Sequence, residues 1–171
     1  MKNENVLDPA QRVKVAQYKG TSWVSRAIKF ATRGKYSHTA IILPDGRIVE
    51  AWQGVNMVRV ISSLSEGHTP GTLVDIYSTN FTESEQTKFI EFIEEQVGKP
   101  YSKWGLVASY FNKSEYNKYE GKRWFCSQVF VAACHAASRF YWGTDTKPWQ
   151  IPPTMVTRNC NFTKIETKVT V

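Results

Sequence analysis

Residues 36–52 read YSHTAIILPDGRIVEAW, which is an apolar run, a Pro-Asp-Gly turn and a second apolar run. In such a turn the proline presets its own φ, and Gly46 supplies the positive φ that other residues disfavour. Apolar runs that flank a turn signal are typical of paired strands. We therefore predict an antiparallel β-hairpin with strands over 37–43 and 47–52.

The predicted hairpin carries two ionisable residues, His38 and Glu50, on neighbouring strands. If the turn pairs Leu43 with Arg47, these two residues are diagonal neighbours on one face of the sheet, within reach of each other. A loop that differs by one residue would place them on opposite faces. The sequence alone leaves both registers open.

Further strands and helices are expected around the hairpin. Thr82 and Glu85 form a capping box at the start of one helix, and Gly98 ends that helix. Because the strands cluster in the first half of the chain and helices flank them, we expect an α+β fold. The other expected strands cover 13–18, 55–60, 71–77 and 162–169, and the expected helices cover about 22–32, 82–97, 102–111 and 126–139.

Two of these helices have clear apolar positions. The expected buried stripe of the helix over 82–97 consists of Phe89, Ile90, Phe92, Ile93 and Val97. The apolar positions of the helix over 22–32 are Trp23, Ala27, Phe30 and Ala31.

Length and composition limit the class of protein. At 171 residues the chain has the size of one domain, and 42% hydrophobic residues are enough for a core. The start of the sequence lacks the apolar run of a signal peptide, and no apolar stretch approaches the length of a membrane span. We therefore expect one soluble, cytoplasmic domain over 1–171. The three cysteines are odd in number and form no Cys-x-x-Cys pair, which argues against a disulfide framework and a structural zinc site.

Cys126 is the candidate nucleophile among the three cysteines. It follows Trp124 and Phe125 at the expected start of a helix, where unpaired N–H groups and the helix dipole stabilise a thiolate and an oxyanion. Cys134 lies in the middle of the same helix among alanines, and Cys160 lies in the tail, so neither has this setting.

The segments 36–42 (YSHTAII), 45–51 (DGRIVEA) and 125–129 (FCSQV) resemble the circularly permuted NlpC/P60 group, and within it the YiiX/YaeF-type proteins. Lecithin–retinol acyltransferase-like enzymes are more distant relatives. The resemblance covers roughly residues 13–140, whereas the tail over 141–171 matches no motif. It implies a permuted papain-like fold, with an antiparallel sheet or partial barrel packed against helices and the cysteine at a helix N-terminus.

By position, the resemblance implies Cys126 as nucleophile, His38 as base and Glu50 as the residue that orients the base. Such a set would form a thioester and pass the acyl group to water or another acceptor. Tyr36 and Ser127 are candidates for oxyanion or substrate contacts. We expect a hydrolase of amide bonds in a small peptide or cell-wall-type substrate, with no cofactor and no metal. The alternatives are a lipid acyl hydrolase or acyltransferase and a silent binding module for an anionic ligand.

The net charge of +7 favours an anionic partner or simply a solvated basic surface. Arg26, Lys29 and Arg33 give the first helix a basic face, which makes them candidates for binding an anion or a membrane surface beside the active site. The segment 112–123 mixes tyrosines with lysines, and we expect a lid over Cys126 rather than a nucleic-acid site. The oligomeric state, including a dimer, stays open.

Overall fold

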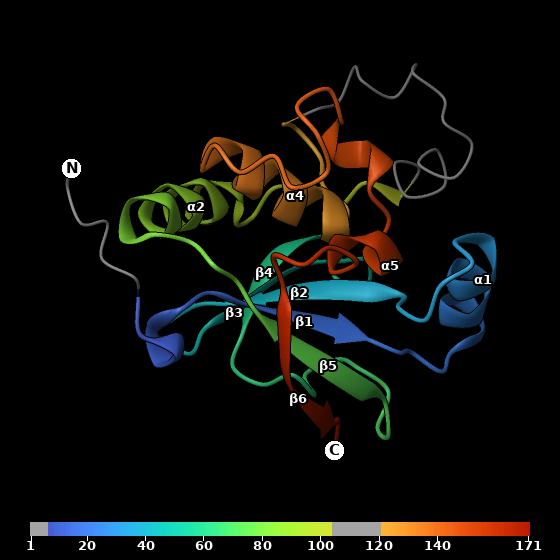
Figure 1. Ribbon diagram of the computed structural model, residues 1–171. Coiled ribbons are helices and arrows are strands. Elements are labelled where there is room, and N and C mark those ends of the chain that lie inside the picture. The colour runs from blue at the N-terminus through green and yellow to red at the C-terminus, as the bar shows by residue number, and fades with distance from the viewer. Residues whose placement is uncertain (1–6, 104–120) are drawn as a thin grey trace.

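The computed structural model describes residues 7–103 and 121–171, and a six-stranded antiparallel sheet organises them (Figure 1). The strand order is β4-β3-β2-β1-β5-β6. This mixed sheet-and-helix architecture confirms the predicted α+β class. The strands are β1 (Lys14–Tyr18), β2 (His38–Ile42), β3 (Ile48–Trp52), β4 (Met57–Ile61), β5 (Leu73–Ser78) and β6 (Thr163–Val169).

Helices α2, α4 and α5 cover one face of the sheet, whereas α1 lies at its side (Figure 1). Every helix in the described parts of the chain is too short or too polar to cross a membrane. The helix expected over 102–111 and the lid expected over 112–123 lie mostly outside the described residues. The bounds are α1 (Trp23–Ala31), α2 (Glu83–Gln96), α4 (Cys126–Ala136) and α5 (Pro153–Val156), with 3-10 turns at Pro9–Gln11 and Pro148–Gln150.

The hairpin adopts the first of the two registers that the sequence leaves open, the one that pairs Leu43 with Arg47. Ile41 is opposite Val49, and the Leu43 N–H donates to the Arg47 carbonyl over 2.8 Å. Gly46 has a φ of 89°, the conformation for which the turn requires glycine. The hairpin prediction is therefore confirmed, and His38 and Glu50 share a face of the sheet.

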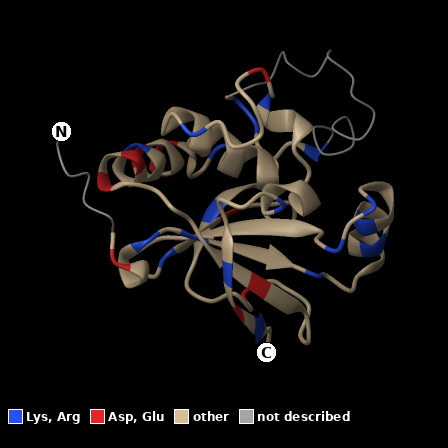
Figure 2. Cartoon of the chain, viewed as in Figure 1, with Lys and Arg blue, Asp and Glu red and all other residues tan. Residues whose placement is uncertain are grey.

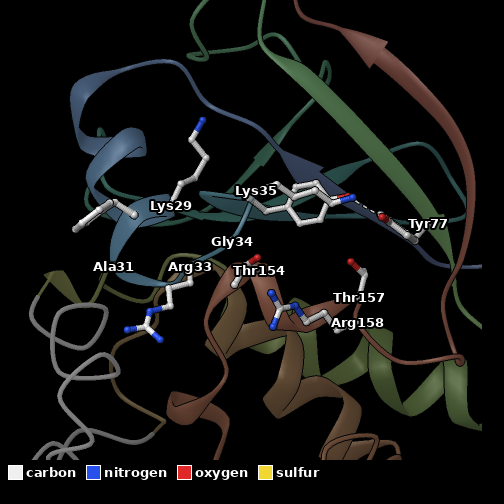
Figure 3. A pocket seen from close by; sticks show the side chains of 11 residues that line it. Lys29, Ala31, Arg33, Gly34, Lys35, Tyr77, Thr154, Thr157 and Arg158 are labelled. Carbon is white, nitrogen blue, oxygen red and sulfur yellow. Dashed lines mark hydrogen bonds between the residues drawn. The ribbon is translucent and has the colours of Figure 1, made fainter.

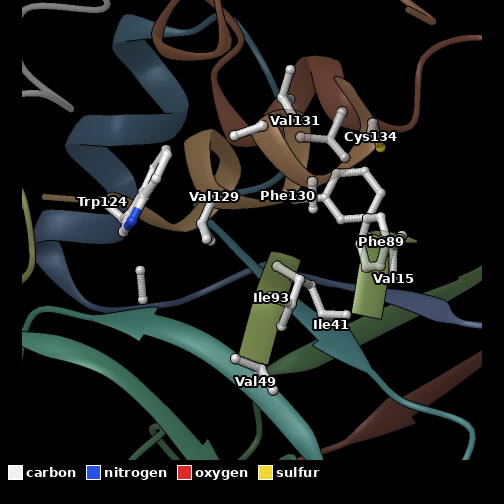
Figure 4. Close-up of a cluster of buried hydrophobic side chains, with 14 of the residues drawn as sticks. Val15, Ile41, Val49, Phe89, Ile93, Trp124, Val129, Phe130, Val131 and Cys134 are labelled. Carbon is white, nitrogen blue, oxygen red and sulfur yellow. The ribbon is translucent and has the colours of Figure 1, made fainter. Parts of the chain in front are cut away.

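The main core lies between the sheet and helices α2 and α4 (Figure 4). Ile41 and Val49 from the sheet meet Phe89 and Ile93 of α2 and Phe130 of α4, and each of the five is at most 1% exposed. Full burial of a side chain of this size contributes roughly 1.5–3 kcal/mol. The packing fixes α4, and with it Cys126, against the strands that carry His38 and Glu50.

Helix α2 begins with the predicted capping box. The Thr82 N–H donates to the Glu85 carboxylate over 2.8 Å, and the Glu85 N–H donates to the Thr82 hydroxyl over 3.4 Å. Its buried stripe differs from the prediction at Val97, which is 40% exposed. Gln86 is buried instead, because its amide bonds backbone groups near β1: it accepts from the Val13 N–H over 2.7 Å. Burial of a glutamine is tolerated when its polar atoms are paired in this way.

Helix α1 has the predicted cap, since Ser22 accepts from the Ser25 N–H over 3.2 Å. The expectation of one basic helical face is wrong for Arg33, because the helix ends at Ala31 and Arg33 has a φ of 47° outside it. Helix α4 likewise ends at Ala136 rather than at Arg139, since Ser138 adopts a φ of 60°. Positive φ at a non-glycine residue is incompatible with continued helix.

The tail over 141–171, which matched no motif, belongs to the fold. Its last strand, β6, pairs with β5 at the edge of the sheet. Its short helix α5 packs against the turn after α1, where a side chain at Gly34 would overlap Thr154. The tail therefore closes the sheet on one side and supports the connection that leads into β2.

Candidate active site

Cys126 is the first residue of α4, as predicted, and its side chain is 2% exposed. The chain enters the helix in an extended conformation that is fixed by backbone hydrogen bonds. The Trp124 N–H donates to the Pro100 carbonyl over 3.0 Å, and the Ser102 N–H donates to the Trp124 carbonyl over 2.8 Å. The other cysteines differ in setting, because Cys134 is buried within α4 and Cys160 is exposed.

The first turn of α4 offers the two features expected of an anion-stabilising site, namely N–H groups without intrahelical partners and the positive end of the helix dipole. Ser127 lies in this turn, but its hydroxyl donates to the Ile151 carbonyl over 2.7 Å. That hydrogen bond ties α4 to the segment before α5. Because the Ser127 hydroxyl is already paired, the predicted contact of Ser127 with a substrate or oxyanion would use its backbone N–H rather than its side chain.

His38 lies beside both other members of the predicted set. Its Nε2 atom lies 2.6 Å from Oε2 of Glu50, and it lines the same cavity as Cys126, whose charge acts on its ring. Because Nε2 bonds Glu50, Nδ1 is the ring nitrogen left for proton exchange. Burial lowers the pKa of His38, but the charge and hydrogen bond of Cys126, together with Glu50, outweigh this and raise the pKa to about 10.

Glu50 is fully buried and is held as a carboxylate by several donors. Arg59, its cross-strand partner on β4, donates to Oε1 from Nε over 2.9 Å and from Nη2 over 2.7 Å. Burial raises the pKa of Glu50, but hydrogen bonds and charge from His38 and His68 lower it by more. The pKa is therefore below its usual value, and the group stays ionised. A paired, buried carboxylate of this kind can orient an imidazole and stabilise its protonated form.

His68 is a member of the cluster that sequence analysis missed. Its Nε2 lies 3.0 Å from Oε2 of Glu50, and its ring stacks on Tyr18 at a centroid distance of 4.1 Å. The residue comes from the loop between β4 and β5, where no periodic pattern indicates which way a side chain points. The contact of Arg59 with Glu50 could have been predicted from the sequence, because Arg59 lies in an alternating run that follows the strand of Glu50 after one short turn.

Cys126 and His38 open into a cavity of about 370 Å³. This size falls within the range of small-molecule sites. Its walls mix apolar and polar side chains from α1, from the end of β3 and from the segment before α4. The other lining residues are Ser22, Val24, Ser25, Ile28, Ser37, Trp52, Gln53, Gly54, Tyr101 and Lys103.

Several other predicted site residues lie elsewhere. Tyr36 is 2% exposed and donates its hydroxyl proton to Asp75 over 2.7 Å, so its phenol serves a buried structural hydrogen bond. Lys29 and Arg33 line a separate cavity of about 870 Å³ beside α5, together with Tyr36 (Figure 3). Arg26 lines neither cavity. The basic residues of α1 therefore do not face Cys126 in the described structure.

The described residues thus form an α+β protein with a buried Cys–His–Glu cluster at the N-terminus of a helix. The crystal structure of the metalloprotein YiiX from Escherichia coli O157:H7, assigned to DUF1105, has a similar fold, with a TM-score of 0.65 and 17% identity. The match covers 94% of this chain and 99% of that chain. No protein-family model matches the sequence. No curated protein matches it either.

Proposed function

We propose that the protein is a cysteine hydrolase with a circularly permuted NlpC/P60 fold, in which Cys126 attacks an acyl carbon, His38 transfers protons and Glu50 orients His38. The chain order His, Glu, Cys and the likeness to YiiX support the permuted assignment. The observation that carries the proposal is that one imidazole, His38, is hydrogen-bonded to the carboxylate of Glu50 and lines the same cavity as Cys126, whose charge raises the pKa of the imidazole.

The charges of the cluster suit thiolate chemistry. A histidine whose pKa is raised to about 10 is protonated at neutral pH, and an imidazolium next to a thiol favours the thiolate. The thiolate is the nucleophilic form of cysteine. Glu50 contributes by holding Nε2–H of His38, so that Nδ1 carries the proton that is exchanged with the substrate.

In the proposed reaction, Sγ of Cys126 bonds to the carbonyl carbon, and the N–H groups in the first turn of α4 stabilise the oxyanion. Nδ1 of His38 gives its proton to the leaving amine, the C–N bond breaks and a thioester remains. The now neutral His38 takes a proton from water, whose oxygen attacks the thioester. The carboxylic acid leaves, and the thiolate–imidazolium pair is restored.

Amide bonds of a small peptide or cell-wall fragment are the proposed substrates, because the cavity has room for a small group and polar walls that can bind a peptide. The same cluster could act on a lipid ester or transfer its acyl group. A silent binding module with this fold would lack a reactive thiol, which separates that alternative from both enzymes.

The test is to trap the thioester. The wild-type protein is mixed with an activated ester, p-nitrophenyl acetate, then quenched in acid and analysed by peptide mass spectrometry. We expect acetyl on Cys126, none at this position in Cys126→Ala, and slow formation in His38→Ala. Cys160 is the internal control for an exposed, unassisted thiol. Equal acetylation of Cys126 and Cys160 would refute the proposal.

A second candidate function is metal binding, because His38, Glu50 and His68 place three ligand atoms within 4.8 Å of one another. Two imidazoles and a carboxylate are a donor set that suits Zn²⁺. The set fits such an ion, although Arg59 on the same carboxylate adds a positive charge that disfavours it. A zinc ion held by His38, Glu50 and His68 would supply Lewis-acid chemistry.

Zinc titration by calorimetry on the metal-free protein separates the two candidates. If the cluster is a zinc site, the wild type binds one ion, His68→Ala loses most of the affinity and His135→Ala does not. If the cluster serves the thiol, His68→Ala and His135→Ala bind zinc equally weakly.

A further inference from the structure

Helix α1 turns its apolar side towards solvent. Trp23 is 80% exposed and Phe30 is 88% exposed, and no residue of the helix is buried. The half-buried positions that face the rest of the protein are Ser25, Ile28 and Lys29. The helix therefore packs through a largely polar side, the reverse of the usual arrangement in a globular protein.

The exposed apolar residues form one patch. Trp23 and Phe30 are separated by about two helical turns, and Ala27 lies between them on the same side. Single exposed apolar residues are ordinary, whereas contiguous large ones mark an interaction surface. The patch made by Trp23, Ala27 and Phe30 is therefore a candidate binding surface.

The charge around this patch is of one sign. Between Tyr18 and Asp45 the sequence contains five Lys or Arg residues and no Asp or Glu. Neither Arg26 nor Arg33 forms an ion pair with a described residue. Figure 2 shows basic but no acidic residues on α1, whereas acidic residues are visible on α2, far across the molecule. An anionic surface would complement this charge.

We propose that α1 docks the protein on an anionic phospholipid membrane, with Trp23 and Phe30 inserted at the level of the headgroups and Arg26 and Arg33 bound to phosphates. Aromatic rings beside basic side chains on a short amphipathic helix are suited to the boundary between headgroups and acyl chains. The helix lies on the surface and does not cross the bilayer, in keeping with its nine residues.

Docking would also determine where the protein encounters its substrate. Val24, Ser25 and Ile28 of the same helix line the cavity that contains Cys126. A membrane bound to the outer side of α1 would therefore lie beside the cavity. The acyl group would then come from an ester or amide held at the lipid surface; this part of the inference rests on the proposed function.

The test is co-sedimentation with vesicles of phosphatidylcholine, alone or mixed with an equal part of phosphatidylglycerol. We expect the wild type to bind the mixed vesicles, and to bind less as salt rises. The double variant Trp23→Ser/Phe30→Ser should partition about tenfold or more weakly, because both rings are removed. Arg26→Gln/Arg33→Gln should lose the preference for phosphatidylglycerol.

Matched controls remove the same groups elsewhere. Ile165→Ser/Val171→Ser deletes two other exposed apolar side chains, and Lys88→Gln/Lys168→Gln deletes two other charges; both should bind as the wild type does. Unchanged binding of Trp23→Ser/Phe30→Ser would overturn the proposal. It would also fall if, without lipid, the wild type sediments as a dimer and this variant as a monomer, since the patch would then cover a second copy.

The docking proposal and the catalytic proposal can be tested independently of each other. Cys126→Ala should bind vesicles as the wild type does, because docking does not use the thiol. Trp23→Ser/Phe30→Ser should keep the wild-type rate of Cys126 alkylation by iodoacetamide in solution, since neither residue lines the cavity with Cys126.

Discussion

Nε2 of His38 lies 2.6 Å from Oε2 of Glu50, across a hairpin that separates the two residues by 12 positions. This contact occupies Nε2 and leaves Nδ1 for proton exchange, and it joins His38 to a buried network that includes Arg59 and His68. Each member of the network can be replaced separately, and each replacement has its own expected effect.

The pKa of His38 should depend on Cys126. In the wild type we expect His38 to remain protonated up to a pKa of about 10, because the Cys126 charge and Glu50 outweigh burial. Cys126→Ala removes the largest of the causes that raise this pKa, whereas burial, which lowers it, remains. The pKa of His38 should therefore fall in Cys126→Ala and stay unchanged in Cys134→Ala, as followed by NMR of labelled histidines. Equal titration of His38 in all three proteins would contradict the pairing.

Glu50→Gln should weaken both the reactivity and the fold. The substitution leaves the Arg59 guanidinium, whose side chain is 15% exposed, without its carboxylate. Breaking a buried pair from one side costs about 3–5 kcal/mol of unfolding free energy. Cys126 alkylation should slow, but less than in His38→Ala. In urea unfolding, Glu66→Gln is the control, since its carboxylate is half exposed and lies 3.9 Å from Arg59. A Glu50→Gln protein as stable as the wild type would speak against the network.

His68 should act as a positioning residue. His68→Phe keeps a ring against Tyr18 but removes the hydrogen bond to Glu50. The loss of one hydrogen bond of about 0.5–1.5 kcal/mol corresponds to a two- to tenfold slower alkylation of Cys126. The same change at His135, on the far end of α4, should have no effect. If both variants react at the wild-type rate, His68 only fills space.

Tyr36 should matter for stability and not for chemistry. Tyr36→Phe leaves the buried carboxylate of Asp75 one donor short, at a cost of about 1–3 kcal/mol. Tyr141→Phe, which loses an exposed hydrogen bond to Asn80, should cost less. Acetylation of Cys126 in Tyr36→Phe should match the wild type. A loss of acetylation as large as that in His38→Ala would restore the substrate or oxyanion role predicted from the sequence.

The parts of the site that the sequence predicted are those set by local rules. The Pro-Asp-Gly turn predicts the hairpin of β2 and β3, whereas its register, which the sequence left open, comes from the structure and brings His38 to Glu50. The placement of Cys126 follows equally from local pattern, because an extended pair of aromatic residues precedes an apolar helix. Both conclusions needed only short stretches of chain.

The parts that the sequence did not predict depend on distant packing. His68 reaches Glu50 from an irregular loop, and nothing in the loop itself determines that contact. The direction in which Trp23 and Phe30 point depends on how α1 sits on the rest of the protein, and the helical pattern alone does not state which side is covered. Tyr36 was assigned to the site by proximity in sequence, whereas its hydroxyl turns to Asp75.

The proposed thiolate–imidazolium pair is tested most directly by the pH dependence of Cys126 alkylation by iodoacetamide, read by peptide mass spectrometry. Cys160, which is exposed, serves as the control for an unassisted thiol. We expect Cys126 to react faster than Cys160 below about pH 7, where an ordinary thiol is protonated, and we expect His38→Ala to abolish this advantage. If Cys126 reacts no faster than Cys160 at low pH, or if His38→Ala reacts as the wild type does, the thiolate–imidazolium pair does not exist.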